Sequence, residues 1–398
     1  ATAREARMEA PGQGVPNAAV DGAEGGAMGC ATSHISKYIN TDKQIAYLLS
    51  CIAVLPEPYA SLDTNRLTVA YFCVSALDVL GQLDRIDAPS IIRWVYSLQV
   101  LPADDSNAPP ECCGGFRGSG YMGAPFDERG SVSSCEYDSA HIAMTYTALA
   151  VLLILGDDLS RVKRESALRF VSALQDGTGC FAAYSGGERD MRFLFCATAI
   201  CAMLGDARCD SIDVSSATQY VCSSQAFDGG LGLGPGMESH GGSTYTGLAA
   251  LSLMGKIHML ERKDKLVQWC VERQVSGFQG RPNKAEDTCY SFWIGASLEL
   301  LGAHRLTHLD ALSQFAHRCQ YKYGGIAKCT GSHPDVLHTY FALCGLSLAG
   351  VRGLEPIDAR LGVSLRAATR AGLAAPDATC ALVCETDESP TEVAMYRK

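Results

Sequence analysis

The sequence lacks any uninterrupted run of about 18 apolar residues, the length that a membrane-spanning helix requires. Its most apolar segment, residues 148–155, is far too short, so we expect no membrane span and no stable membrane insertion. An excess of positive charge is also missing, because 33 Lys and Arg face 43 Asp and Glu, a net charge of −10. Phosphate contacts need clustered basic residues, so we expect no nucleic-acid partner.

Few segments alternate polar and apolar residues with a period of two, which predicts little sheet and an all-α fold. Charged residues make up only 19% of the 398 residues and hydrophobic ones 47%, enough for a large buried core. No apolar core of a signal peptide is recognisable. Many of the 18 cysteines lie in apolar runs. Together these features indicate reduced, buried thiols and predict a cytoplasmic protein.

An internal repeat organises the chain. Apolar helical runs end repeatedly at a glycine, a helix C-terminal signal, and the last four intervals between these glycines are 47 to 50 residues. The stops are Gly81, Gly156, Gly205, Gly255, Gly302 and Gly350. A Gln followed by a Gly-containing turn precedes each of the last four stops, at Gln175, Gln225, Gln274 and Gln320. Each unit therefore predicts an outer helix, a Gly-rich turn and an inner helix.

About six such units predict an α/α barrel, or toroid, with an open solenoid as the alternative. Closure is favoured because the inner runs, such as residues 195–204 and 245–254, are apolar almost all round and must be buried. We expect residues 1–40 to be a disordered tail, residues 41–352 to form the barrel and residues 353–398 to be a tail ordered in part at most. The Gly-, Pro- and Ser-rich residues 102–136 predict a surface-loop insertion.

An ionisable residue lies 15 positions before each of the last five stops, at the predicted start of an inner helix. These residues are His141, Asp190, His240, Asp287 and Asp335. Equivalent helix starts meet at one mouth of a barrel, where unpaired N–H groups favour anions. Simple N-capping is the alternative for Asp190 and Asp335, but it does not account for the histidines.

Asp287, Cys289 and His338 offer the oxygen, sulfur and nitrogen ligands that zinc accepts, and three protein ligands leave a fourth position open for catalysis. On spacing alone, each could equally be a core residue. Polar and basic residues expected near this point suggest a phosphate or diphosphate site: Arg192, His240, Arg281, Lys284 and Tyr290. A solvated loop is the alternative. Phe72, Phe195 and Trp293 would line the barrel below, either as core or around a long apolar ligand.

Three segments are similar to the β subunits of the protein prenyltransferases, over roughly residues 45–352. They are residues 277–293, which contain GFQGRPNK and DTCYSFW, residues 238–244 and residues 332–338. The resemblance implies one zinc per β subunit on Asp287, Cys289 and His338. It implies that His240, Arg281, Lys284 and Tyr290 bind the diphosphate of an isoprenoid substrate, and that a separate α subunit completes a heterodimer.

Within this family, two positions favour the geranylgeranyl type I enzymes. Thr68 stands where farnesyl enzymes carry a Trp that shortens the lipid tunnel, and Lys328 stands where they carry a magnesium-binding Asp. No Mg²⁺ requirement is then expected. The resemblance assigns His141, Ala143, Phe193 and Leu337 to the pocket for the last residue of the acceptor peptide. The implied reaction is geranylgeranyl transfer to the Cys of C-terminal C-a-a-X motifs, with X often Leu, on small GTPases of the Rho, Rac and Rap types.

Three alternatives remain. A farnesyltransferase or Rab-type β subunit is of the same class, and Thr68 and Lys328 argue against the farnesyl version. A terpene cyclase would need an Asp-rich motif, which the pairs Asp104-Asp105 and Asp157-Asp158 do not form. A non-catalytic helical scaffold would not need Asp287, Cys289 and His338 together with the basic rim.

Overall fold

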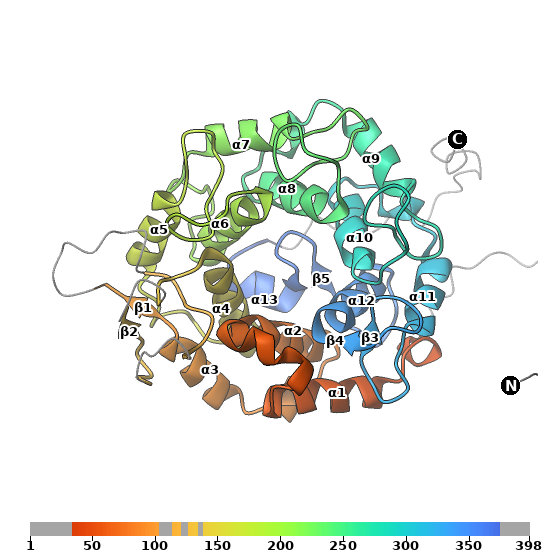
Figure 1. Cartoon of the computed structure of the whole chain (residues 1–398), viewed down its shortest axis with the longest axis horizontal. Helices are drawn as coiled ribbons and strands as arrows, with labels where there is room; N and C mark the ends of the chain where they lie inside the picture. The colour runs from red at the N-terminus through yellow and green to blue at the C-terminus, as the bar shows by residue number, and fades with distance from the viewer. Residues whose placement is uncertain (1–33, 103–113, 121–125, 134–137, 375–398) are drawn as a thin grey trace, which may run out of the picture. The chain divides into compact units, whose positions relative to one another are not determined.

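The computed structural model describes residues 34–102, 114–120, 126–133 and 138–374. The chain divides into two units, residues 1–32 and residues 33–398, and every described residue belongs to the second. Helices dominate this unit, in pairs of one outer and one inner helix (Figure 1). The outer helices are α1 (Thr41–Ala53), α3 (Ala88–Ser97), α5 (Arg164–Ala173), α7 (Val214–Ser223), α9 (Lys263–Val271) and α11 (Leu309–Arg318). The inner helices are α2 (Arg66–Val79), α4 (Ile142–Leu155), α6 (Met191–Met203), α8 (Gly241–Leu253), α10 (Tyr290–Leu300) and α12 (Val336–Leu348).

The inner helices form a closed ring. Each packs against the inner helix before it and the one after it, and α12 packs back against α2 (Figure 1). The predicted α/α barrel is therefore confirmed, and the open solenoid is excluded. Almost every residue of α4 is buried, as expected for a helix that is apolar all round. All six predicted stop glycines have φ between +66° and +88°, the left-handed conformation that ends a helix cheaply when the residue is glycine.

The repeated glutamine holds neighbouring units together. In five turns its side-chain amide hydrogen-bonds the backbone of the residue that precedes an outer helix, at 2.7 to 3.3 Å. Gln320 accepts from the N–H of Asn40, which joins the last unit to the first. Gln99, which the sequence analysis did not include, plays the same part by accepting from the N–H of Lys163. The five glutamines are Gln99, Gln175, Gln225, Gln274 and Gln320.

The predicted insertion interrupts one of these turns. Gln99 pairs with Phe116 just as Gln225 pairs with Leu231, so the extra residues lie between a glutamine and its Gly-containing turn. Val100–Leu101 (β1) pairs in parallel with Ser131–Val132 (β2). The expectation of a surface loop is wrong for residues 114–117, since Phe116 is fully buried and packs in the core. Residues 103–113, 121–125 and 134–137 lie outside the described residues.

A buried ion pair anchors this insertion, and its loss should destabilise the fold. The Nε of Arg117 lies 3.0 Å from Oδ1 of Asp138, and both side chains are buried. We predict that Arg117→Ala lowers the free energy of unfolding by about 3–5 kcal/mol, because it removes one partner of a buried ion pair. Thermal and urea denaturation measure this. Arg208→Ala removes the exposed pair with Asp210 and should leave the melting temperature unchanged; an equal loss in both variants would contradict the prediction.

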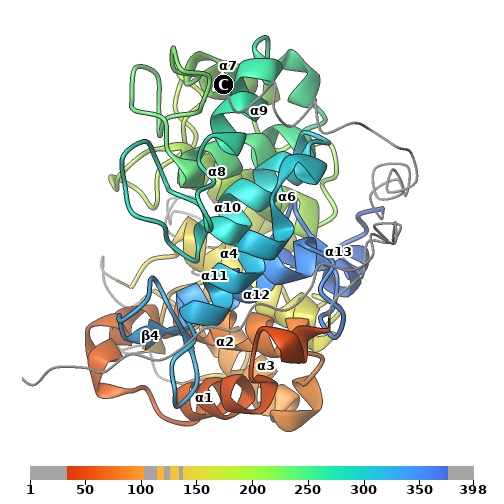
Figure 2. The same ribbon diagram turned by 90° about the vertical axis from the view of Figure 1, so that its right-hand side faces the viewer.

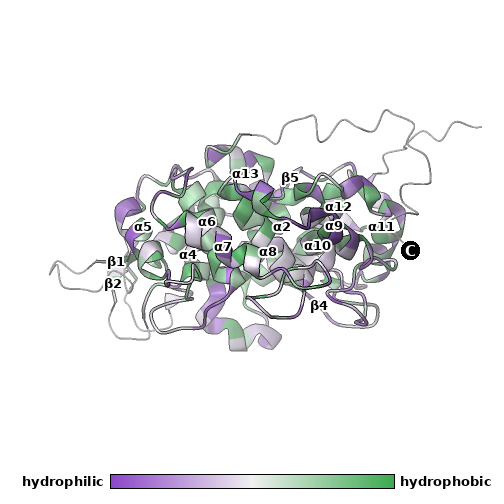
Figure 3. Ribbon diagram, turned by 90° about the horizontal axis from the view of Figure 1, so that it is seen from above, coloured by the Kyte–Doolittle hydropathy of each residue, from purple (hydrophilic) through white to green (hydrophobic). Residues whose placement is uncertain are grey.

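The two barrel ends differ. Ile326–Ala327 (β3) and Pro334–Asp335 (β4) pair antiparallel near the starts of inner helices. Ile357–Asp358 (β5), Val363–Ser364 (β6) and Leu365–Arg370 (α13) lie at the other end (Figures 2 and 3). The sequence analysis ended the barrel at residue 352, and the structure adds this packed segment through residue 374. Residues 34–40, predicted as disordered tail, instead contain the 3-10 turn Ile35–Lys37 (η1) with buried Ile35, Tyr38 and Ile39.

Further 3-10 turns lie between some of the described helices. They are Glu57–Asn65 (η2), Leu83–Arg85 (η3), Ile257–Met259 (η6) and His304–Leu306 (η7). Within the described ranges no single helix has the length and apolar composition to cross a membrane. One bent pair, Thr41–Ala53 with Glu57–Val79, passes that test together, by length and composition only.

Candidate functional site

Five helix starts carry the ionisable residues that the repeat predicts, and four of the five side chains are N-caps, while Asp287 lies two residues before Cys289, the N-cap residue of α10. Each accepts a hydrogen bond from a backbone N–H two or three residues later, at 2.8 to 3.1 Å. The expectation that capping cannot explain the histidines is wrong. A neutral imidazole has one nitrogen that accepts, and Nδ1 of His141 and of His240 does so. The five residues are His141, Asp190, His240, Asp287 and Asp335, and all but Asp287 are N-caps.

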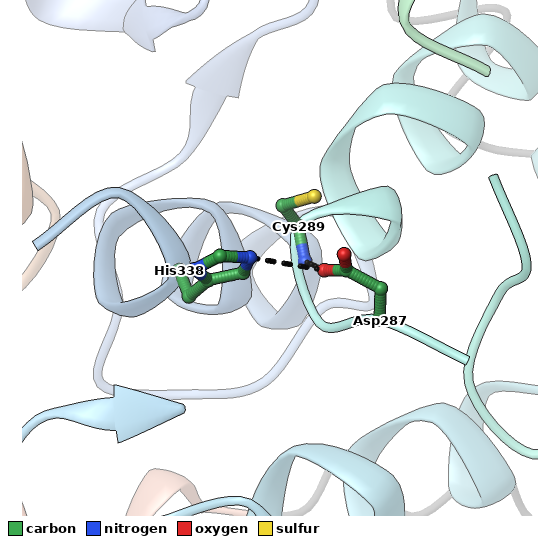
Figure 4. Close-up of side chains that lie close together, drawn as sticks. All are labelled: Asp287, Cys289 and His338. Atoms are coloured by element: carbon green, nitrogen blue, oxygen red, sulfur yellow. Dashed lines mark hydrogen bonds and ion pairs between the residues drawn. The ribbon is translucent and has the colours of Figure 1, made fainter. Parts of the chain in front are cut away.

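Three of the predicted residues meet between the starts of α10 and α12 (Figure 4). The candidate ligand atoms of Asp287, Cys289 and His338 all lie within 4.8 Å of one another. Oδ1 of Asp287 lies 3.2 Å from Nε2 of His338. On the far side of the imidazole, Oδ2 of Asp335 lies 2.5 Å from Nδ1 of His338, which orients Nε2 toward the other two residues. A carboxylate behind a histidine is the usual support of a metal-binding imidazole.

The electrostatics of this cluster favour a cation. Burial and then the nearby Asp287 carboxylate raise the pKa of the Cys289 thiol well above its usual value. Burial lowers the pKa of His338, but its hydrogen bonds to Asp287 and Asp335 outweigh this and raise the pKa to about 9. A divalent cation among the three would instead stabilise the thiolate and the neutral imidazole. The oxygen, sulfur and nitrogen donors, two of them almost fully buried, therefore fit zinc.

Lys328 lies beside this cluster, with its Nζ 3.6 Å from Oδ2 of Asp287. Thr288 holds it there through two hydrogen bonds. The Thr288 N–H donates to the carbonyl of Lys328 at 2.9 Å, and its hydroxyl donates to the carbonyl of Ala327 at 2.9 Å. The sequence analysis assigned no role to Thr288, because the repeat pattern does not show which residue its hydroxyl contacts in the folded protein.

A cavity of about 530 Å³ opens next to His240, and four predicted residues line it: Arg192, His240, Arg281 and Trp293. Two of these residues, Arg281 and Arg192, each form an ion pair with an acidic side chain. Nη1 of Arg281 lies 2.5 Å from Oε2 of Glu238, and Nη2 of Arg192 lies 2.6 Å from Oδ2 of Asp190. The predicted Lys284 is exposed and is not among the lining residues.

Tyr290 hydrogen-bonds to His240, which lines this cavity. Its hydroxyl lies 3.0 Å from Nε2 of His240. Because Nδ1 of that ring accepts the N–H of Gly242, Nε2 of the neutral ring carries the proton and donates to the Tyr290 oxygen. Burial and then the charge of Arg281 lower the pKa of His240, which keeps the ring neutral. The O–H of Tyr290 is left as a donor for an anion.

The predicted apolar lining residues lie on the inner helices. Phe72 of α2 contacts Phe341 with ring centroids 5.6 Å apart, and Trp293 of α10 contacts Phe341 at 4.2 Å. Phe195 of α6 contacts Tyr146 at 5.3 Å. Thr68, in the first turn of α2, donates its hydroxyl to Sδ of Met144 at 3.4 Å.

Three of the four predicted peptide-pocket residues come together at the starts of α4 and α6. The rings of His141 and Phe193 lie 6.2 Å apart, and the N–H of Ala143 donates to Nδ1 of His141. Leu337 is at the start of α12, next to His338, and α2 separates α12 from α4 in the ring. Leu337 directly precedes His338 of the candidate metal site in the sequence.

Comparison with known proteins agrees with the fold. A family model described as "Prenyltransferase alpha-alpha toroid domain" matches residues 39–363. The structure is also similar to that of Candida albicans protein geranylgeranyltransferase-I complexed with GGPP. The TM-score is 0.73, with 23% identity over 84% of this chain and 98% of the other. That likeness confirms the fold.

Relatives in sequence show more specifically which class of protein the chain belongs to. The geranylgeranyl transferase type-1 subunit beta of Arabidopsis thaliana is 42% identical over 82% of this chain and 89% of its own. Its Dictyostelium discoideum namesake is 38% identical over 83% and 96%. The protein farnesyltransferase subunit beta of Schizosaccharomyces pombe is 30% identical over 78% of both. The chain therefore belongs to the protein prenyltransferase β subunits, and the type-1 relatives make it an enzyme of the protein geranylgeranyltransferase class.

Proposed function

We propose that this chain acts in a heterodimer with a prenyltransferase α subunit, and that it transfers a geranylgeranyl group from geranylgeranyl diphosphate to a protein thiol. The acceptor is the Cys of a C-terminal C-a-a-X motif, with X preferably Leu, on Rho-, Rac- or Rap-type small GTPases in the cytoplasm. The observation that carries the proposal is the Asp287, Cys289 and His338 cluster beside a cavity lined by Arg281 and His240.

One zinc ion fits the three-residue cluster by its donors. What zinc supplies at such a site is a lowered pKa for a nearby substrate thiol, so that thiolate is present near neutral pH. Asp335 holds His338 in the orientation that ligation needs, through the 2.5 Å contact. Asp287 and Cys289 are almost fully buried, so bulk water is kept from these two donors.

The cavity residues would receive the leaving group. As the thiolate sulfur bonds to C1 of the lipid, the C1–O bond breaks and its electron pair moves to the diphosphate. Arg281 and His240 line the cavity where this charge grows, and the Nε2–H of His240 holds the Tyr290 hydroxyl beside it. The O–H of Tyr290 adds a second donor, and Arg192 and Lys284 complete the proposed set. Such donors act mainly on the transition state, since charge is greatest there.

Lys328 is proposed to neutralise the diphosphate where farnesyl enzymes use Mg²⁺, so that transfer needs no added Mg²⁺. We predict that Thr288→Val lowers kcat/KM by about tenfold, because it frees Lys328 from its position beside Asp287. Thr288→Ser keeps the hydroxyl and is the matched control. Steady-state kinetics with and without Mg²⁺ measure the effect. Equal activity in Thr288→Val and wild type would refute this role.

The lipid and the peptide are assigned to neighbouring walls. Phe72, Phe195 and Trp293 are proposed to contact the isoprenoid, with Thr68 leaving room for its fourth unit. We predict that Thr68→Trp moves the preference toward farnesyl diphosphate by about tenfold or more, because a large side chain fills that room. His141, Ala143, Phe193 and Leu337 are proposed to contact the last residue of the acceptor.

The test is a transfer assay with the co-expressed heterodimer. Peptides ending in C-a-a-Leu and C-a-a-Ser are incubated with geranylgeranyl or farnesyl diphosphate, with and without Mg²⁺. We expect geranylgeranylation of the Leu peptide without Mg²⁺, and the altered lipid preference in Thr68→Trp. Farnesylation of the Ser peptide alone, and only with Mg²⁺, would refute the assigned lipid and metal requirements.

A further inference from the structure

An aromatic residue occurs at one position of all six repeats, ten residues before each stop glycine and five after the start position of the inner helix. The six are Tyr71, Tyr146, Phe195, Tyr245, Phe292 and Tyr340. All six are buried. Equivalent positions on six inner helices lie at one level of the barrel, so these side chains form a single layer across its axis, which we call the aromatic layer.

Ring contacts run continuously through the aromatic layer. Tyr71 contacts Tyr146 at 5.7 Å, and Tyr146 contacts Phe195 at 5.3 Å. Phe195 contacts Tyr245 at 5.6 Å, and Tyr245 contacts Phe292 at 4.9 Å. Phe341 bridges the remaining gap, 5.2 Å from Phe292 and 5.1 Å from Tyr340, and Tyr340 returns to Tyr71 at 5.7 Å. The ring contacts thus run once round the barrel, five residues along the inner helices from their start positions.

The far side of this layer is held by the C-terminal segment. The hydroxyls of Tyr71 and Tyr340 both donate to the carbonyl of Gly362, the first at 3.0 Å, and the hydroxyl of Tyr146 donates to the carbonyl of Leu361 at 2.7 Å. These carbonyls belong to the turn between β5 and β6, at the barrel end that carries α13 (Figure 3). We call residues 357–370 the stopper.

The stopper fits closely against the layer. Gly362 has a φ of +64°, and a Cβ there would lie 3.2 Å from Cζ of Phe292 and 3.3 Å from the hydroxyl of Tyr245. Glycine is thus required both by conformation and by space. Leu361 is fully buried in the core.

Two further residues, Asp78 and Arg370, fix the stopper from outside the layer. Asp78, a buried carboxylate of α2, accepts from the hydroxyl of Ser364 at 2.6 Å and from Arg366. Nη1 of Arg370 donates to the carbonyls of Leu153 and Ile154 at the end of α4. The stopper is therefore tied to the same two helices, α2 and α4, whose tyrosines touch its turn.

These two helices also carry Thr68 and Met144, which lie 3.4 Å apart. Thr68 precedes Tyr71 by one helical turn, and Met144 precedes Tyr146 by two residues. The hydroxyls of Tyr71 and Tyr146 are 3.0 Å apart. The place proposed for the fourth isoprene unit thus lies about one turn above the point where the stopper meets the layer.

We infer that the stopper sets the longest isoprenoid that the enzyme accepts, by holding Tyr71, Tyr146 and Tyr340 against the end of the lipid. The inference rests on the proposed lipid position at Thr68. A fifth isoprene unit would have to displace the tyrosines of the aromatic layer. Their hydrogen bonds to the carbonyls of Leu361 and Gly362 would then break. Chain-length selection would then depend on residues of the C-terminal segment that do not touch the lipid.

The test uses the full heterodimer with geranylgeranyl diphosphate and with geranylfarnesyl diphosphate, which is one isoprene unit longer. Tyr71→Phe combined with Tyr340→Phe removes both donors to Gly362 while keeping the rings. Arg366→Gln loosens the stopper without touching the layer. Hydrogen–deuterium exchange reports on residues 357–370, and kcat/KM is measured for both lipids. Tyr96→Phe is the matched control, because its hydroxyl bonds Asp157 away from the layer.

We expect both alterations to speed amide exchange in the stopper and to raise use of the longer lipid, relative to geranylgeranyl diphosphate, by about tenfold. Faster exchange with an unchanged lipid ratio would overturn the inference. An unchanged rate of amide exchange in the stopper would also overturn it. So would an equal rise in the relative use of the longer lipid by Tyr96→Phe. If the double variant does not fold, Arg366→Gln decides. A wild-type heterodimer that transfers no geranylgeranyl group would instead refute the proposed function.

Discussion

Cys289→Ala is expected to abolish zinc binding and to reduce geranylgeranyl transfer by at least about a thousandfold. The thiol is one of only three donors in the cluster, and it is almost fully buried with Asp287. A catalytic metal supplies several kcal/mol of charge stabilisation, and each 1.36 kcal/mol is a factor of ten in rate. Elemental analysis of the purified heterodimer and single-turnover transfer measure the two effects.

The matched control is Cys270→Ala, a buried cysteine of α9 that is not in the cluster. It should keep both zinc and activity at wild-type levels. Transfer by Cys289→Ala at a tenth of the wild-type rate or more would show that the thiol is not a ligand at the reacting centre.

Arg281→Ala is expected to lower kcat by about 10²–10³-fold. Its guanidinium lines the cavity beside His240 and is paired only with the exposed Glu238 among the ion pairs of the described residues. Because charge on the diphosphate grows as the C1–O bond breaks, the lost contact affects the transition state more than the bound substrate. Steady-state kinetics with varied geranylgeranyl diphosphate separate kcat from KM.

Arg169→Ala, on the outer face of α5, removes the same charge far from the cavity and should leave kcat unchanged. A rise in KM alone in Arg281→Ala would mean that this residue binds substrate and transition state equally, contrary to the proposed role.

The repeat made most of the fold predictable. Glycine stops and apolar inner runs are properties of single segments, and they fixed the barrel and the location of the ionisable helix starts. Gln99 was not recognised as a member of the repeat, because the insertion separates it from its Gly-containing turn and changes the spacing. Residues 114–117 were predicted as surface from composition, but the same turn that is buried in the other units is buried here too.

The site was predictable where residue type alone suggests chemistry. Asp287, Cys289 and His338 are typical zinc ligands, and the structure brings them together. Thr288 and Asp335 act through hydrogen bonds to neighbouring segments, so their parts follow only from the folded arrangement. The capping histidines were misjudged because a neutral imidazole accepts a backbone N–H as readily as it donates.

The C-terminal stopper was beyond sequence reasoning for a different reason. Residues 353–374 carry no copy of the repeat, and so their contact with the repeated tyrosines has no sequence signal. The aromatic position itself is visible in all six units, but its hydroxyl partners lie in a turn that only the fold places there.

The most direct test of the account is zinc titration of the metal-stripped heterodimer, read out as geranylgeranyl transfer to a C-a-a-Leu peptide in the absence of Mg²⁺. The account predicts that wild-type activity returns at one zinc per heterodimer and that Cys289→Ala stays inactive at the same zinc. Full activity of the stripped wild-type protein without zinc, or equal recovery of both proteins, would contradict it.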